Sequence, residues 1–130
     1  MVITYDWSGT GMRDLDTSTT FLGELVGWSC GAGGDYLLWI TGDITSTDGA
    51  EVVHAKVDQA LADGQWTSVV AINLMAGWYA PAEGTGPATV RVTYKGVTQS
   101  KAIEPGSQGG CAATSVGIIT VANDGTFILS

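Results

Sequence analysis

Charged side chains are scarce in this chain, and positive charge is the scarcest. Only 14% of the 130 residues are charged, against about 25% in typical soluble domains, and five Lys and Arg stand against thirteen Asp and Glu. The resulting net charge of −8 repels phosphate backbones and anionic lipid headgroups, so neither nucleic acid nor a membrane surface is an expected partner. A surface so short of charge favours self-association or a place in a larger assembly, with a neutral Thr- and Ser-rich surface as the alternative.

Long apolar runs, secretion signals and closely spaced cysteines are also missing. No stretch approaches the roughly 20 apolar residues of a membrane-spanning helix, and residues 1–7 lack the basic-then-apolar pattern of a signal peptide. We therefore expect a cytoplasmic or a virion protein, without a choice between them. Cys30 and Cys111 lie too far apart for a zinc-type pair and can form at most one disulfide, a pairing that the sequence leaves open.

Strand signals fill most of the chain, as short runs rich in Val, Ile, Thr, Tyr and Trp between Gly, Asp, Asn and Pro clusters. Apolar and polar residues alternate over 88–94, and Lys95-Gly96 follows as a hairpin turn. Only residues 57–64 have a helical pattern, of two turns at most. The expected strands cover residues 2–7, 14–21, 24–29, 35–41, 51–57, 67–76, 88–94, 97–103, 113–122 and 126–129. The sequence thus predicts one all-β domain over residues 1–130, an antiparallel β-sandwich with at most one short helical turn.

Two carboxylates stand close together near the start of the chain. If residues 14–21 form a strand, Asp14, Asp16 and Ser18 share one face, because successive side chains alternate. Two neighbouring carboxylates repel each other unless a hard cation neutralises them, and calcium is the usual choice for a set of carboxylate, carbonyl and hydroxyl oxygens. The pair therefore indicates calcium binding.

A second acidic segment, residues 41–51, leads into the next strand. Asp43, Asp48 and Glu51 can surround one ion together with loop carbonyls, although their spacing is not that of an EF-hand loop. The alternative for either acidic segment is structural, because Asp is frequent in turns.

These two segments resemble a known family. The order Asp14-Leu15-Asp16, then a strand, then Gly42-Asp43 with an acidic loop ending at Glu51, is similar to the calcium-binding tellurium-resistance (TerD-type) proteins. The resemblance implies a β-sandwich in which Asp14, Asp16, Asp43 and Glu51, and less closely Asp48, are calcium ligands. The chain departs from the family pattern at Ile44, where the family has Asn, and in carrying one Asp where the family loop has a pair.

Five tryptophans are many for a chain of this length. Trp39 lies in an apolar strand and is expected in the core, whereas Trp78 and Tyr79 precede the irregular loop 81–87 and are expected to be exposed. Exposed aromatic side chains stack on sugar rings or anchor protein interfaces, so Trp78 and Tyr79 are candidate binding residues and a glycan is a candidate ligand.

Catalytic motifs are not evident. The single histidine, His54, lies in the middle of a strand, where a sheet-face side chain is a better interpretation than a general base. The sequence contains neither a nucleophile elbow nor a phosphate-binding glycine loop. We therefore expect a protein that is not an enzyme.

The function that these patterns favour is that of a calcium-binding β-sandwich that serves as a structural or interaction module. A subunit or decoration protein of a phage virion is the first interpretation, suggested by small size, low charge and richness in Gly, Thr and Ser. A cytoplasmic stress protein of the tellurium-resistance type and a carbohydrate-binding module are the alternatives.

Overall fold

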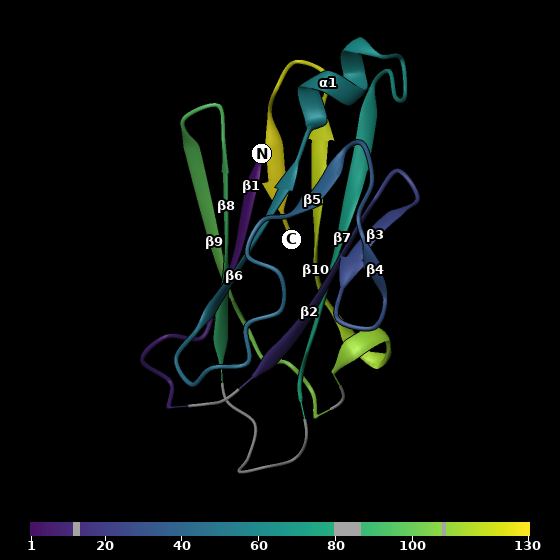
Figure 1. Ribbon diagram of the computed structural model, residues 1–130. Coiled ribbons are helices and arrows are strands. Elements are labelled where there is room, and N and C mark those ends of the chain that lie inside the picture. The colour runs from purple at the N-terminus through teal and green to yellow at the C-terminus, as the bar shows by residue number, and fades with distance from the viewer. Residues whose placement is uncertain (12–13, 80–86, 108) are drawn as a thin grey trace.

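The computed structural model describes residues 1–11, 14–79, 87–107 and 109–130, which fold into two antiparallel sheets packed face to face (Figure 1). The five-stranded sheet has the order β5 (Leu37–Trp39), β6 (Ala50–Ala55), β1 (Val2–Asp6), β8 (Ala88–Tyr94) and β9 (Val97–Ile103). The six-stranded sheet has the order β11 (Phe127–Leu129), β10 (Thr114–Ala122), β7 (Val69–Trp78), β2 (Leu15–Phe21), β3 (Glu24–Gly27) and β4 (Gly31–Ala32). The predicted all-β sandwich is confirmed.

Alternating side chains of both sheets form the core. In β8, for example, Val90, Val92 and Tyr94 are buried while the residues between them face outward. Tyr5 of β1 crosses the core, and its hydroxyl lies 2.7 Å from the hydroxyl of Thr19 in β2. The two inner faces are thereby joined by a buried hydrogen bond as well as by apolar contact.

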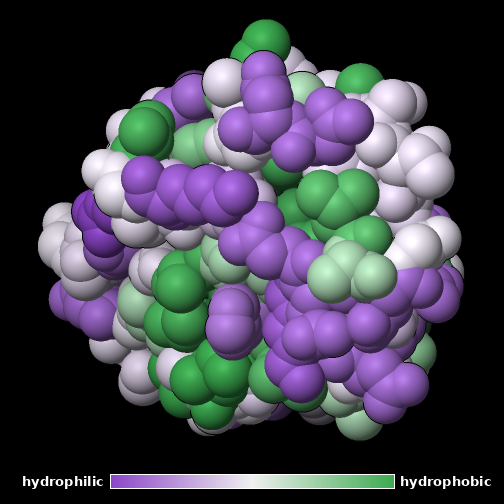
Figure 2. Space-filling view, turned by 90° about the horizontal axis from the view of Figure 1, so that it is seen from above, coloured by the Kyte–Doolittle hydropathy of each residue, from purple (hydrophilic) through white to green (hydrophobic). Residues whose placement is uncertain are grey.

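Helical structure is confined to two short segments within the described residues. Helix α1 (Val57–Ala62) follows β6 at one end of the sandwich, and the 3-10 turn η1 (Gly110–Ala112) lies at the opposite end (Figure 1). The helix was predicted at residues 57–64, and it ends before Gly64, whose positive φ of 73° suits glycine. None of the described helices is long and apolar enough to cross a membrane. Figure 2 looks onto the α1 end, where hydrophobic residues lie in patches between hydrophilic ones.

The predicted strand positions agree with the observed ones apart from their ends. The largest difference is the strand expected at 35–41, of which only Leu37–Trp39 pairs, with β6. Strand β4 and the turn η1 were not predicted, because two- and three-residue Gly-rich segments carry no periodic signal. Apart from Pro87, the predicted recognition loop 81–87 lies outside the described residues.

One side of the sandwich is closed by side chains of the edge strand β9. The Gln99 amide donates to the carbonyl of Phe127 and accepts from the N–H of Leu129, and Lys101 Nζ donates to the carbonyl of Val116. Gln99 therefore occupies backbone groups of the edge strand β11 that would otherwise be open to a further strand.

Candidate metal centre

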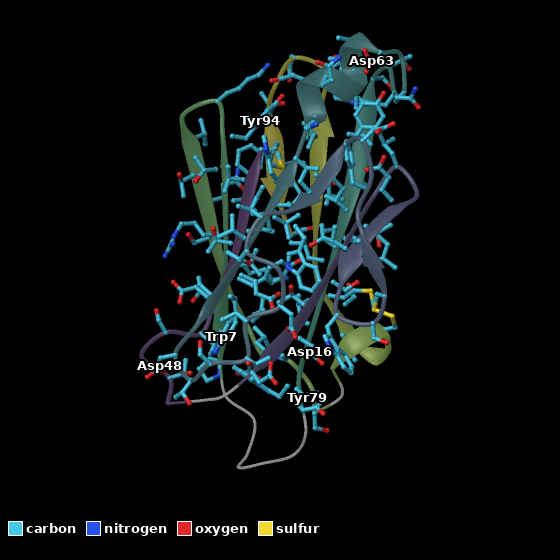
Figure 3. All side chains as sticks on the ribbon, in the orientation of Figure 1. Trp7, Asp16, Asp48, Asp63, Tyr79 and Tyr94 are labelled. Atoms are coloured by element: carbon cyan, nitrogen blue, oxygen red, sulfur yellow. A yellow bond between two sulfur atoms is a disulfide. The ribbon has the colours of Figure 1, made fainter. Side chains whose placement is uncertain are left out.

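Three carboxylates from two separate segments meet at the η1 end of the sandwich. Asp14 precedes β2, Asp16 is in β2, and Asp43 lies in the connection between β5 and β6. Each offers a carboxylate oxygen, and the three oxygens lie within 4.8 Å of one another. Asp16 is labelled in Figure 3, at the end of the molecule opposite Asp63 of the α1 region. The tertiary structure thus brings together three of the five residues predicted as metal ligands.

Asp14 reaches this cluster through a turn and not through strand alternation. Strand β2 begins at Leu15, and Asp14 has a positive φ of 52°. Its carbonyl accepts a 2.9 Å hydrogen bond from the N–H of Tyr79, at the end of the neighbouring strand β7. The expectation that Asp14 and Asp16 share one face of a strand is therefore wrong, because a left-handed residue interrupts the alternation, yet the two carboxylates still converge.

Asp16 is the most buried member of the cluster, with an exposed fraction of 2%, and its Oδ2 atom has no hydrogen-bond partner among the described residues. The segment before η1 covers it. The backbone of Gly109 approaches Asp16 Oδ2 so closely that no Cβ fits there, and the N–H of Gly110 donates to the carboxylate. Burial, and after it the charge of Asp14, raise the pKa of Asp16 to about 6. A carboxylate in this position needs a proton or a cation.

Glu51 lies beneath the cluster and is fully buried. Its Oε1 accepts a 3.0 Å hydrogen bond from the N–H of Ile44, and its Oε2 accepts a short one from the Thr17 hydroxyl. Burial raises the pKa of Glu51 to about 7, and the charges of Asp43 and Asp16 act in the same direction. Both of its oxygens already accept hydrogen bonds, and Glu51 lies outside the group of three converging carboxylates.

The other two members of the acidic loop differ from each other. Asp43 is half-buried, and within the part of the chain that the structure describes its Oδ1 atom has no hydrogen-bond partner. Asp48 is exposed, has a positive φ of 55°, and accepts a 2.8 Å hydrogen bond from the N–H of Gly11. Asp48 is therefore a turn residue outside the group of converging carboxylates, as the structural alternative for this loop anticipates.

The aromatic residues are arranged differently from expectation. Trp78 is 2% exposed, so the prediction that it is exposed is wrong: it is the last residue of β7, and its neighbour Tyr79 takes the outward position. Tyr79 is 49% exposed, as predicted. Its partner is Trp28, which is 43% exposed and packs edge to face on it at a centroid distance of 5.7 Å. The predicted core residue Trp39 is half-buried against the core.

A disulfide joins Cys30 to Cys111, a pairing on which the sequence was silent. It connects the turn after β3 to η1, the same segment whose Gly110 bonds to Asp16. The role of this segment was not predictable from the sequence, because only the tertiary structure brings Gly109 and Gly110 next to Asp16. The Gly-rich setting of Cys111 was the one available signal.

No family model, curated protein or solved structure matches this chain. The resemblance to the tellurium-resistance proteins therefore stays a prediction, carried by the two acidic segments. What the described residues offer chemically is a partly covered set of oxygen ligands at one end of a cross-linked β-sandwich.

Proposed function

We propose that this protein is a non-enzymatic β-sandwich module that binds one calcium ion through Asp14, Asp16 and Asp43. The observation that carries the proposal is the buried Asp16 carboxylate, which lies beside two further carboxylates and whose Oδ2 has no hydrogen-bond partner among the described residues. A buried carboxylate without compensation costs several kcal/mol, roughly, and like charges at this spacing raise the cost. A divalent cation removes both penalties at once.

The donor set supports calcium over zinc and the softer metals. All three converging groups are carboxylates, which are hard oxygen ligands, and the two cysteines are bonded to each other. Calcium accepts six to eight oxygens, roughly, in flexible geometry, and water or backbone carbonyls complete such a shell. Magnesium requires a stricter octahedron and keeps more of its water, so the proposal expects it to bind more weakly.

Thermal unfolding of the purified protein in calcium and in chelator tests the proposal. Calcium that binds only the folded state must raise the melting temperature, and at 100 times the dissociation constant it adds about 2.7 kcal/mol to the free energy of unfolding. We expect Asp16→Asn and Asp43→Asn to lose this calcium-dependent increase, because each removes a ligand charge from the cluster.

Asp48→Asn is the matched control. It removes the same charge from the same acidic loop, keeps an oxygen acceptor for the Gly11 N–H, and suits the positive φ at that position. We expect it to respond to calcium as the native chain does. A melting temperature that is unchanged between chelator and millimolar calcium would reject the calcium site, and equal losses in all three variants would indicate a nonspecific charge effect.

A structural role in an assembly of copies of this chain is supported by the six-stranded sheet. Strands β7, β10 and β11 contain no charged residue, and their outward side chains include Val69, Ile118 and Ile128, which are 58%, 40% and 66% exposed. Chains of net charge −8 approach one another most easily through an uncharged face. We expect light scattering to give a mass above that of one chain, and Ile128→Lys to reduce it. A monomeric native chain at high concentration would exclude self-association.

A further inference from the structure

We propose that Trp28 and Tyr79 form a stacking platform for a neutral carbohydrate beside the carboxylate cluster. The dependence of binding on calcium rests on the function proposed above, whereas the platform rests on different residues. Both rings are exposed, by 43% and 49%, and they contact each other at an interplanar angle of 67°. By contrast, Trp7, Trp66 and Trp78 are buried.

The platform adjoins the carboxylate cluster through two independent connections. The backbone N–H of Tyr79 donates to the carbonyl of Asp14. Gly110 lies between Trp28 and Asp16: a Cβ on this glycine would be 3.3 Å from Trp28 Cε3, and its N–H donates to the Asp16 carboxylate. The rings and the cluster are thus neighbours, and Asp14, which is half-buried and bonded to the Tyr79 backbone, is the acidic residue that a disaccharide on the rings would reach first. Figure 3 shows Tyr79 and Asp16 at the same end of the molecule.

The Trp28 ring is held in place before any ligand arrives. It lies in the turn after β3, two residues before Cys30, and the disulfide to Cys111 ties this turn to η1. The edge of the ring lies near Gly110, and the ring also packs against that of Tyr79. A large aromatic side chain that is exposed and already ordered loses little entropy on binding, which is typical of residues that dominate the energy of an interface.

Two observations, together with the chemistry of sugars, favour a neutral sugar over other ligands. The net charge of −8 and the adjacent carboxylates repel phosphate and anionic glycans. Sugar hydroxyls donate hydrogen bonds to carboxylates and supply oxygens to a bound calcium, while the apolar ring faces of a sugar stack on aromatic rings. An extended peptide would need a strand edge to pair with, and the edge strand on this side, β4, has only the residues Gly31–Ala32.

The test begins with an array of neutral oligosaccharides, probed with the full chain in calcium and in chelator. The neutral glycan that binds most strongly is then titrated into the protein while tryptophan fluorescence is followed. We expect Trp28→Ala and Tyr79→Ala each to weaken binding by about tenfold or more, because each removes one of the two exposed rings. Tyr79→Phe keeps the ring and should retain binding, and Val97→Ala, which removes exposed apolar surface from β9, should have no effect.

The outcomes separate the platform from the calcium site. The platform is overturned if no neutral glycan binds at millimolar concentration, if binding survives both alanine substitutions, or if a peptide library binds in place of the glycans and depends on Trp28. Binding of equal strength in chelator would overturn the link to the cation. Thermal unfolding of Trp28→Ala in calcium tests the cation site independently, because this variant keeps Asp14, Asp16 and Asp43 and should keep the calcium-dependent increase in melting temperature.

Discussion

Glu51→Gln should stabilise the calcium-free protein at neutral and alkaline pH. The Glu51 side chain is fully buried, and burial raises its pKa from 4.5 to about 7. Glutamine has the same shape and can keep both hydrogen bonds: its oxygen accepts from the N–H of Ile44, and its amide donates to the Thr17 hydroxyl. The substitution therefore removes a buried charge and keeps one hydrogen bond at the oxygen and one at the nitrogen of the new amide.

The size and the pH window follow from linkage. Below pH 4.5 both the folded and the unfolded chain carry the proton on Glu51, so this group has no effect on stability there. Between pH 4.5 and about 7 the unfolded chain has released the proton while the folded chain still holds it, so the free energy of unfolding falls as the pH rises. Each pKa unit is worth about 1.4 kcal/mol, so the loss is about 3 kcal/mol above pH 7.

Chemical denaturation in chelator, repeated from pH 4 to pH 8, measures this effect. We expect Glu51→Gln to match the native chain near pH 4 and to exceed it by about 3 kcal/mol at pH 8, or about 10 °C in melting temperature. In the Glu51→Gln variant the free energy of unfolding should still fall somewhat as the pH rises, because burial also raises the pKa of Asp16, to about 6. Saturating calcium should remove much of that remaining decline, because it neutralises the cluster.

Glu24→Gln is the matched control, and it should change the stability in the opposite direction. The Glu24 carboxylate accepts hydrogen bonds from the backbone N–H groups of Asp35, Tyr36 and Leu37, and an amide nitrogen cannot accept them. The same chemical change should therefore lower stability at position 24 and raise it at position 51. A Glu51→Gln variant that is less stable than the native chain at pH 8, or a difference that is the same at every pH, would refute the reasoning.

The remaining predictions concern the disulfide. Cys30 and Cys111 are 81 residues apart in sequence, so replacing both by Ser should lower the free energy of unfolding by on the order of 4 kcal/mol, measured by denaturation against the oxidised native chain. The same variant should show a smaller calcium-dependent increase in melting temperature, because η1 is no longer tied to the turn after β3 and Gly109 and Gly110 hold Asp16 less firmly. An undiminished increase would mean that η1 does not position the ligands.

The positions of the strands were predictable from local sequence. Alternating residues in 88–94 and the turn at Lys95-Gly96 specify a hairpin because both signals act between near neighbours in the chain. The short β4 and η1 were not predictable, since so few residues show no period. Asp14 shows the same limit: its residue type suggested a ligand, but its left-handed backbone is set by the turn it occupies.

The candidate site was predictable only in part. Carboxylates at Asp14, Asp16 and Asp43 stand out in a chain with few charges, and these three converge. Asp48 has the same chemistry in the same loop and lies outside the group, because its position depends on how the loop folds against Gly11. Trp28 is exposed and Trp78 is buried. The sequence could not distinguish them, because both residues are tryptophan and equally apolar.

By itself, the sequence determined the fold class, the strand positions and the acidic character of the site, because hydrophobic alternation, turn chemistry and residue charge act locally. The tertiary structure alone decided which carboxylates meet, which of them is the most buried, that Cys30 bonds to Cys111, and that Trp28 stands beside Tyr79. These features depend on segments far apart in the chain, and only the packing of the two sheets and of η1 brings such segments together.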